Sequence, residues 1–187
     1  MTTKSPGESG LLLIDVVAVL TEARVSYAVI GAMAAAVHGV VRASVDADVI
    51  LAADLPHLRR LAQQFANAGL ETQLREGDAA DPISAVLALK DTYGNRVDLL
   101  AGLRGLEPAA FSRAITVSFQ ETALRVIGLE DFIAMKLFAG SPIDRLDART
   151  AIQVAGAALD RLLLRRLAER YGPATRQALD AMLTELP

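Results

Sequence analysis

The sequence contains no cysteine, which excludes disulfide bonds and thiolate metal sites. Aromatic residues make up only 4% of the chain and tryptophan is absent, so no platform for stacking nucleic-acid bases is evident. Positive charge is not in excess either, because 19 Lys and Arg residues stand against 22 Asp and Glu residues and the net charge is −3. A polyanionic partner would therefore have to meet a local basic patch, since bulk electrostatics attract neither nucleic acid nor a membrane.

Long apolar runs are also lacking. The longest weakly polar run, residues 27–41, is shorter than the roughly 20 residues that span a bilayer. The N-terminal stretch has no convincing small-residue cleavage site. We therefore expect neither a membrane span nor a signal peptide, and a cytoplasmic location. The 187 residues, 52% of them hydrophobic and 22% charged, are enough for one folded domain or for a core domain with a helical appendage.

The pattern of apolar residues predicts an α/β fold whose character changes near residue 129. The first part alternates strands with helices, and every later segment predicts a helix. We expect a mixed α/β (α+β) core over residues 1–128, followed by a helical region, 129–187, that packs on the core. The expected strands are 26–30, a segment that carries Asp46 and Asp48 and ends at Leu51, 70–75, 86–90, 96–100, 115–119 and 123–126. The expected helices are 11–24, 32–37, 54–69, 107–114, 130–139, 142–159, 160–171 and 173–186.

Asp46 and Asp48 form the first candidate site. Alternate residues of a strand share a face, so these carboxylates would lie roughly 6.6 Å apart at the backbone. Two carboxylates on one face suit a hard cation such as Mg²⁺, and without a cation one of them would stay protonated. A solvated strand face is the alternative, because a chain with 13 aspartates contains such a pair by chance. The apolar residues around the pair favour a metal site, since burying uncompensated charge is costly.

The segment before this pair predicts an anion site. Gly31 ends the first strand and can turn tightly, exposing backbone N–H groups at the start of an alanine-rich helix. An ordinary strand-to-helix turn is the alternative. Arg42 and Ser44 lie in the loop before the acidic pair, where Arg42 would either contact a phosphate or pair with Asp46 or Asp48.

Four charged residues further along the chain are also candidates. Asp98 is a carboxylate in the apolar strand 96–100, after a hairpin turn at 93–95. Lys136 lies in an apolar helix and is one of only three lysines beside 16 arginines, which favours a role near phosphate. Snorkelling of Lys136 to solvent is the alternative. Asp144 and Asp147 alternate with arginines, which favours a surface charge network over a catalytic role.

The order and spacing of these residues resemble the DNA polymerase β-type nucleotidyltransferase superfamily, and more narrowly the small bacterial nucleotidyltransferases that include AbiEii-type toxins. The resemblance covers roughly residues 27–150. Ala32 departs from the Gly or Ser common in the family, which removes a hydroxyl contact to phosphate but keeps the backbone N–H. Ser44 stands where Thr is usual. The matching residues are Gly31-Ala32 for the glycine turn, Asp46 and Asp48 for the acidic strand, Asp98 for the third acid, Lys136 for the helix lysine, and Asp144 with Asp147 for an Asp-x-x-Asp element.

This resemblance implies a mixed sheet flanked by helices, with a C-terminal helical region, and a Mg²⁺-dependent activity. A nucleoside monophosphate would move from an NTP, ATP among the candidates, to a hydroxyl on an RNA 3′ end such as that of tRNA, on a protein or on a small molecule. Two Mg²⁺ ions would bind Asp46, Asp48 and Asp98. The nucleotide would contact Gly31, Ala32, Arg42, Ser44 and Lys136. A toxin role would add a cognate antitoxin as a partner.

Two other classes of function stay open at the level of sequence. Ala32 and the absence of a recognisable acceptor site are also compatible with a non-catalytic nucleotide-binding or partner-binding module on the same scaffold. A structural α/β protein with a solvated acidic pair is the third hypothesis.

Overall fold

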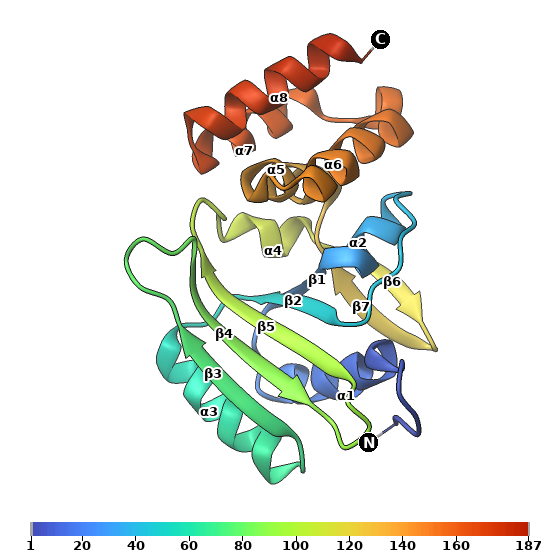
Figure 1. Ribbon diagram of the computed structural model, residues 1–187, viewed down its shortest axis with the longest axis vertical. Helices are drawn as coiled ribbons and strands as arrows, with labels where there is room; N and C mark the ends of the chain where they lie inside the picture. The colour runs from blue at the N-terminus through green and yellow to red at the C-terminus, as the bar shows by residue number, and fades with distance from the viewer. Residues whose placement is uncertain (1, 187) are drawn as a thin grey trace.

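A seven-stranded mixed sheet forms the centre of the protein in a computed structural model that describes residues 2–186 (Figure 1). The strand order is β3-β4-β5-β2-β1-β7-β6, and the central strand β2 runs antiparallel to β1 and parallel to β5. This confirms the predicted mixed sheet flanked by helices. The strands are β1 (Tyr27–Ile30), β2 (Ala47–Leu51), β3 (Glu71–Glu76), β4 (Ile83–Lys90), β5 (Arg96–Leu103), β6 (Ile115–Phe119) and β7 (Thr122–Val126).

Four helices connect or cover these strands. α1 (Ser9–Glu22) packs against β2 and β5, and α3 (Leu55–Asn67) packs against β3 and β4. The start of α3 is fixed locally, because Asp54 accepts a hydrogen bond from the backbone N–H of His57 at 2.9 Å. α2 (Gly31–Val37) follows β1 directly, and α4 (Ala109–Arg113) precedes β6.

The four C-terminal helices form a layer at one end of the molecule, coloured orange to red in Figure 1. They are α5 (Leu129–Ala139), α6 (Pro142–Ala155), α7 (Arg161–Tyr171) and α8 (Pro173–Glu185). α5 contacts the other three, and its buried residues join the same core as those of the sheet. Within residues 2–186, no helix combines the length and hydropathy needed to cross a bilayer. The division at residue 128 stays a prediction.

The helix predicted over 142–159 is shorter than expected. α6 ends at Ala155, and a short 3-10 turn, Gly156–Ala158, follows. Gly156 has a φ of 51°, a left-handed conformation that an α-helix does not accommodate. The chain therefore leaves the helix at this glycine.

The strand β5 determines which side chains reach the functional face of the sheet. Val97, Leu99 and Ala101 are buried on one side, whereas Asp98 and Leu100 are only half-buried on the other. This alternation is the two-residue period of a strand. One face of β5 therefore belongs to the core, and on the other face Leu100 lines a cavity between the sheet and α5.

Candidate active site

Asp48 and Asp98 occupy the same register position on two neighbouring parallel strands. Asp48 on β2 is the pairing partner of Asp98 on β5 at the centre of the sheet. Neighbouring strands lie about 4.8 Å apart, and paired residues point to the same face. Asp98 Oδ1 is buried without a hydrogen-bond partner in the part of the chain that the structure describes. The fold thus brings together two of the three predicted acids.

The environment of Asp48 is short of positive charge. Burial raises the pKa of Asp48 to about 6, and the negative charges of Asp98 and Asp46 add to this effect. Lys136 and Arg42 lower the pKa but offset the rise only in part. A cation between the two carboxylates would remove this imbalance.

Gly31 allows the chain to pass close to the Asp48 carboxylate. Ile30, the last residue of β1, pairs with Asp48, and the chain then bends into α2 at Gly31 with a φ of 64°. A Cβ atom at Gly31 would overlap the Asp48 carboxylate. The predicted glycine turn is therefore confirmed, and it has a second role because only a residue without a side chain leaves room for this carboxylate.

Asp46 lies outside the strand, contrary to the expectation that β2 carries both acids. Pairing of β2 with β5 begins at Ala47, and its pairing with β1 stops at Asp48 because Gly31 leaves the sheet. Asp46 instead lines a hollow of about 260 Å³ together with Ala32, Arg42 and Ser44. The Ser44 hydroxyl donates a hydrogen bond to the main-chain oxygen of Asp46 at 3.0 Å. The predicted residues therefore form two groups rather than one.

Lys136 belongs to a charge cluster between α5 and α6. Its Nζ lies 2.7 Å from Asp144 Oδ1 and 2.9 Å from Asp147 Oδ2, and Arg42 Nε lies 3.2 Å from Asp147 Oδ2. Lys136 therefore does not snorkel to solvent. The prediction that Asp144 and Asp147 form a surface network is wrong, since Asp147 is only 2% exposed. Packing of α6 on α5 turns this carboxylate toward the two cations.

The charge state of Asp144 follows from these contacts. Burial alone would raise its pKa, but hydrogen bonds from Lys136 and Ser141 outweigh burial and lower it. Asp144 is thus an ionised carboxylate held against Lys136 at neutral pH.

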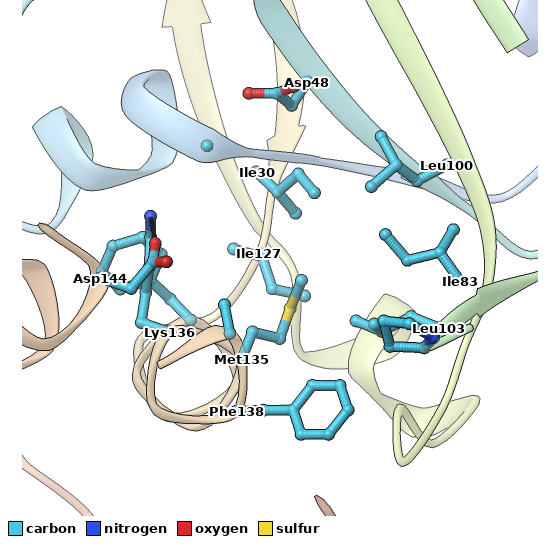
Figure 2. A pocket seen from close by; sticks show the side chains of 14 residues that line it. Ile30, Asp48, Ile83, Leu100, Leu103, Ile127, Met135, Lys136, Phe138 and Asp144 are labelled. Atoms are coloured by element: carbon cyan, nitrogen blue, oxygen red, sulfur yellow. Dashed lines mark hydrogen bonds and ion pairs between the residues drawn. The ribbon is translucent and has the colours of Figure 1, made fainter. Parts of the chain in front are cut away.

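A cavity of about 250 Å³ opens between the sheet and α5, next to Asp48 (Figure 2). Of the 14 residues that line it, only Asp48, Lys136 and Asp144 carry charge. Sequence reasoning missed the cavity, because its apolar side chains look like ordinary core residues. The apolar wall includes Ile83, Leu100, Leu103, Ile127, Met135 and Phe138.

The fold is similar to several solved structures, although no protein-family model and no curated protein matches the chain. A crystal structure of ANT(2″)-Ia in complex with adenylyl-2″-tobramycin aligns with a TM-score of 0.57 and 15% identity, over 87% of this chain and 98% of that one. The chain has a nucleotidyltransferase fold. Two further nucleotidyltransferase-type structures support this assignment.

One is an antigenic nucleotidyltransferase-like protein from Paracoccidioides brasiliensis, with a TM-score of 0.51 and 14% identity over 98% of this chain and 96% of that one. The other is the lincosamide antibiotic adenylyltransferase LnuA in its lincomycin-bound form, with a TM-score of 0.51 and 13% identity over 81% and 99% of the two chains. At these identities the likeness is one of fold, and the narrower AbiEii-like subtype stays a prediction.

A nucleotidyltransferase fold implies a divalent metal, and Asp48 and Asp98 fit one. Carboxylate oxygens are the ligands that Mg²⁺ prefers. Asp98 Oδ1 has no partner, and the raised pKa of Asp48 records a lack of compensating charge. Asp46 is not drawn into this pair, and within residues 2–186 no three His, Cys, Asp or Glu side chains stand close enough to enclose one ion. The fit thus concerns two carboxylates, and the roles of all three acids stay predictions.

Proposed function

We propose that the protein transfers a nucleoside monophosphate from an NTP to an acceptor hydroxyl. The observation that carries this proposal is the Asp48–Asp98 pair at the centre of a nucleotidyltransferase fold, with Gly31 bending the chain against Asp48. An unpartnered carboxylate oxygen in a half-buried site is expensive for a protein that does not use it. This cost supports a catalytic role over a purely structural one.

In the proposed mechanism, the acceptor oxygen attacks the α-phosphorus of the NTP, and pyrophosphate leaves. A carboxylate of the Asp48–Asp98 pair would accept the proton of the acceptor hydroxyl. Asp48 and Asp98 would hold Mg²⁺, with Asp46 as a third ligand if two ions bind; such ions neutralise charge on the entering and departing oxygens. The backbone N–H groups of Gly31 and Ala32 would receive the phosphates.

The cations near the site have distinct parts in this proposal. Arg42 and Ser44 would contact the nucleotide from the hollow that they line with Ala32. Lys136 would meet the phosphates from α5, keeping Asp147 as a partner and exchanging Asp144 for phosphate. The side chain of Asp144 is 18% exposed and that of Asp147 only 3%, so Asp144 is the easier partner to displace.

The acceptor class is the finer part of the proposal. An RNA 3′ end, tRNA included, a protein hydroxyl and a small molecule all fit the chemistry. Two of the similar structures contain adenylyl-2″-tobramycin and lincomycin, which supports a small molecule. A toxin role with a cognate antitoxin and a cytoplasmic location are supported by sequence alone.

The test is label transfer in a cell extract supplemented with Mg²⁺ and α-³²P-labelled NTPs. We expect the wild type to label an acceptor, and Asp48→Ala and Asp98→Ala to label none. Glu22→Ala, an exposed change at the end of α1, is the matched acidic control and retains labelling. With γ-³²P-labelled NTPs the wild type adds no label beyond that of the extract alone, because that phosphate leaves with the pyrophosphate. Equal labelling by the wild type and both aspartate variants would contradict the proposal.

A second candidate is a nucleotide-binding module without turnover. It is favoured by the ion pairs that occupy Lys136 and Arg42 and by the position of Asp46 outside β2, where it does not complete a three-ligand group within residues 2–186. This candidate predicts Mg²⁺-dependent NTP binding with no label on any RNA, protein or small molecule. The two functions therefore differ in label transfer and agree in binding.

A further inference from the structure

We infer that the cavity beside Asp48 is the acceptor site, and that its acceptor is a small alcohol with a mostly apolar body. This inference rests on the proposed nucleotidyl transfer and adds the class of substrate. It starts from where polar and apolar groups lie around the cavity.

The charged groups lie at one end and on one side of the cavity, and apolar groups form the rest of its wall. Figure 2 shows Asp48 at one end and Phe138 at the other, with Lys136 and Asp144 together on one side. Lys136 and Asp144 already form an ion pair at 2.7 Å. A ligand would thus find one unpaired charged group, Asp48, where its hydroxyl would lie, and hydrocarbon along the remaining wall.

This wall disfavours highly polar acceptors. Ile83, Leu100 and Leu103 line one side, and Met135 and Phe138 line the side formed by α5. None of these side chains has a strong hydrogen-bond donor or acceptor. A polyol or a nucleobase would bury polar groups here without hydrogen-bond partners. Each such group would lower the affinity about tenfold. A polycation would find only Asp48 and Asp144, of which Asp144 is paired.

The position of the predicted nucleotide contacts leaves the apolar part of this cavity to the acceptor. Ala32, Arg42 and Ser44 line the other hollow and do not line the cavity. Gly31 lies against Asp48, and Lys136 lies beside Asp144 on one side of the cavity (Figure 2). A nucleotide held by these residues would bring its α-phosphate to the Asp48 end, where an alcohol in the cavity presents its oxygen.

The volume limits the size of this alcohol. The cavity measures about 250 Å³. Pockets for drug-sized ligands measure roughly 300–1,000 Å³. The part of the acceptor that lies inside the cavity therefore has to be compact.

The reaction on such an alcohol balances without a further reactant. The alcohol oxygen forms a bond to the α-phosphorus, and the bond from that phosphorus to the oxygen of the β-phosphate breaks. Pyrophosphate leaves with the bonding electron pair, and the hydroxyl proton passes to a carboxylate of the Asp48–Asp98 pair. The product is a nucleoside monophosphate ester of the alcohol.

A chain-length series tests the inference with the full-length protein. Straight-chain primary alcohols are titrated calorimetrically, and their nucleotidylation is followed by mass spectrometry with Mg²⁺ and NTPs. We expect affinity to improve about fourfold per added methylene until the cavity is full, and then to level off. Diols of equal length bind at least tenfold more weakly. Nucleotidylation of diols or of an RNA 3′ end in preference to every alcohol would overturn the inference.

Met135→Gln provides the matched variant, because it changes polarity at nearly constant length on α5. Its control is Leu162→Gln on α7, where the leucine is 82% exposed. We expect Met135→Gln to raise the KM for the preferred alcohol about tenfold and Leu162→Gln to leave it unchanged. Leu100→Gln repeats the test from the sheet side. An unchanged KM in both cavity variants overturns the inference.

Mg²⁺-dependent NTP binding, measured separately, distinguishes the two levels of failure. If NTP binds and a polar acceptor is labelled, the proposed function is supported and the inference of an apolar acceptor is wrong. If neither NTP binding nor transfer occurs, the proposed function falls and the acceptor assignment with it.

Discussion

Lys136 and Asp147 form a buried ion pair across two helices, with Nζ and Oδ2 2.9 Å apart. The Asp147 side chain is 3% exposed, and Arg42 is its second partner at 3.2 Å. The cluster thus links α5, α6 and the loop before β2. We expect it to affect both the stability of the protein and its proposed affinity for phosphate.

Lys136→Met should destabilise the protein because it leaves Asp147 buried with Arg42 as its main partner. Removing one partner of a buried pair costs about 3 kcal/mol in the free energy of unfolding. Lys90→Met is the control, because Lys90 pairs with Glu71 at 3.4 Å on the surface and such pairs contribute about 1 kcal/mol or less. Urea unfolding measures both. Equal losses of unfolding free energy in the two variants would show that the Lys136 ion pairs contribute no more stability than an exposed ion pair.

Asp144→Asn should tighten NTP binding, because it leaves Lys136 with Asp147 and frees part of its hydrogen-bonding capacity for phosphate. We expect the Kd of the Mg²⁺–NTP complex to fall about tenfold, which is about 1.4 kcal/mol. Calorimetric titration measures this change. Asp180→Asn, which removes a carboxylate paired with Arg176 on α8, should leave the Kd unchanged. Weaker binding after Asp144→Asn would mean that the carboxylate itself serves the nucleotide.

Asp48→Asn should stabilise the metal-free protein at neutral and alkaline pH. The pKa of Asp48 is raised from 3.8 to about 6 in the fold, so the folded form binds its proton more tightly than the unfolded chain does. The stability that this proton gives is fully present below pH 4 and is lost as the pH rises through about 6.

Asp48→Asn does not lose stability in this pH range, because its amide does not ionise. Its free energy of unfolding in EDTA should equal that of the wild type near pH 4 and exceed it by about 3 kcal/mol at pH 8. Denaturation at a series of pH values tests this, with Glu22→Gln as the exposed-carboxylate control. If the difference in unfolding free energy between Asp48→Asn and the wild type does not grow with pH, the pKa of Asp48 is not raised in the folded protein.

Gly31→Ala should impair the site more than an equivalent strain elsewhere. An alanine at positive φ costs about 1–2 kcal/mol in a left-handed conformation. Gly94 has a φ of 86°, and a Cβ atom added there would meet no other atom within 4 Å, so Gly94→Ala carries the backbone cost alone. Gly31→Ala adds an overlap with the Asp48 carboxylate. We expect a larger loss of unfolding free energy and loss of Mg²⁺-dependent NTP binding only in Gly31→Ala. Retained binding would show that Asp48 can move without consequence.

The elements of the fold were predictable where side chains close to the boundary determine it. Asp54 caps α3 directly, and Gly94 lies in the turn between β4 and β5. The end of α6 was missed because Gly156 sits among alanines that favour a helix, and only its φ of 51° reveals the break. The start of β2 at Ala47 was missed because it depends on partners from two distant strands.

The site was predictable to the same extent. The structure places Asp48, Asp98 and Gly31 together. They were predictable as candidates because carboxylates in apolar strands and a glycine at a strand end are local signals. The burial of Asp147 depends on how α6 packs on α5, which no local pattern encodes. The cavity depends on side chains from strands, loops and α5 that meet only after folding.

The central position of β2, with three strands on each side, also affects how the protein unfolds. The edge strands β3 and β6 can open locally, whereas the amide protons of a central strand exchange with solvent only when the whole domain unfolds. Asp48 would therefore keep its neighbours until the last cooperative step. A heated sample should contain native and fully unfolded molecules, and few molecules in which only the central strand is unfolded.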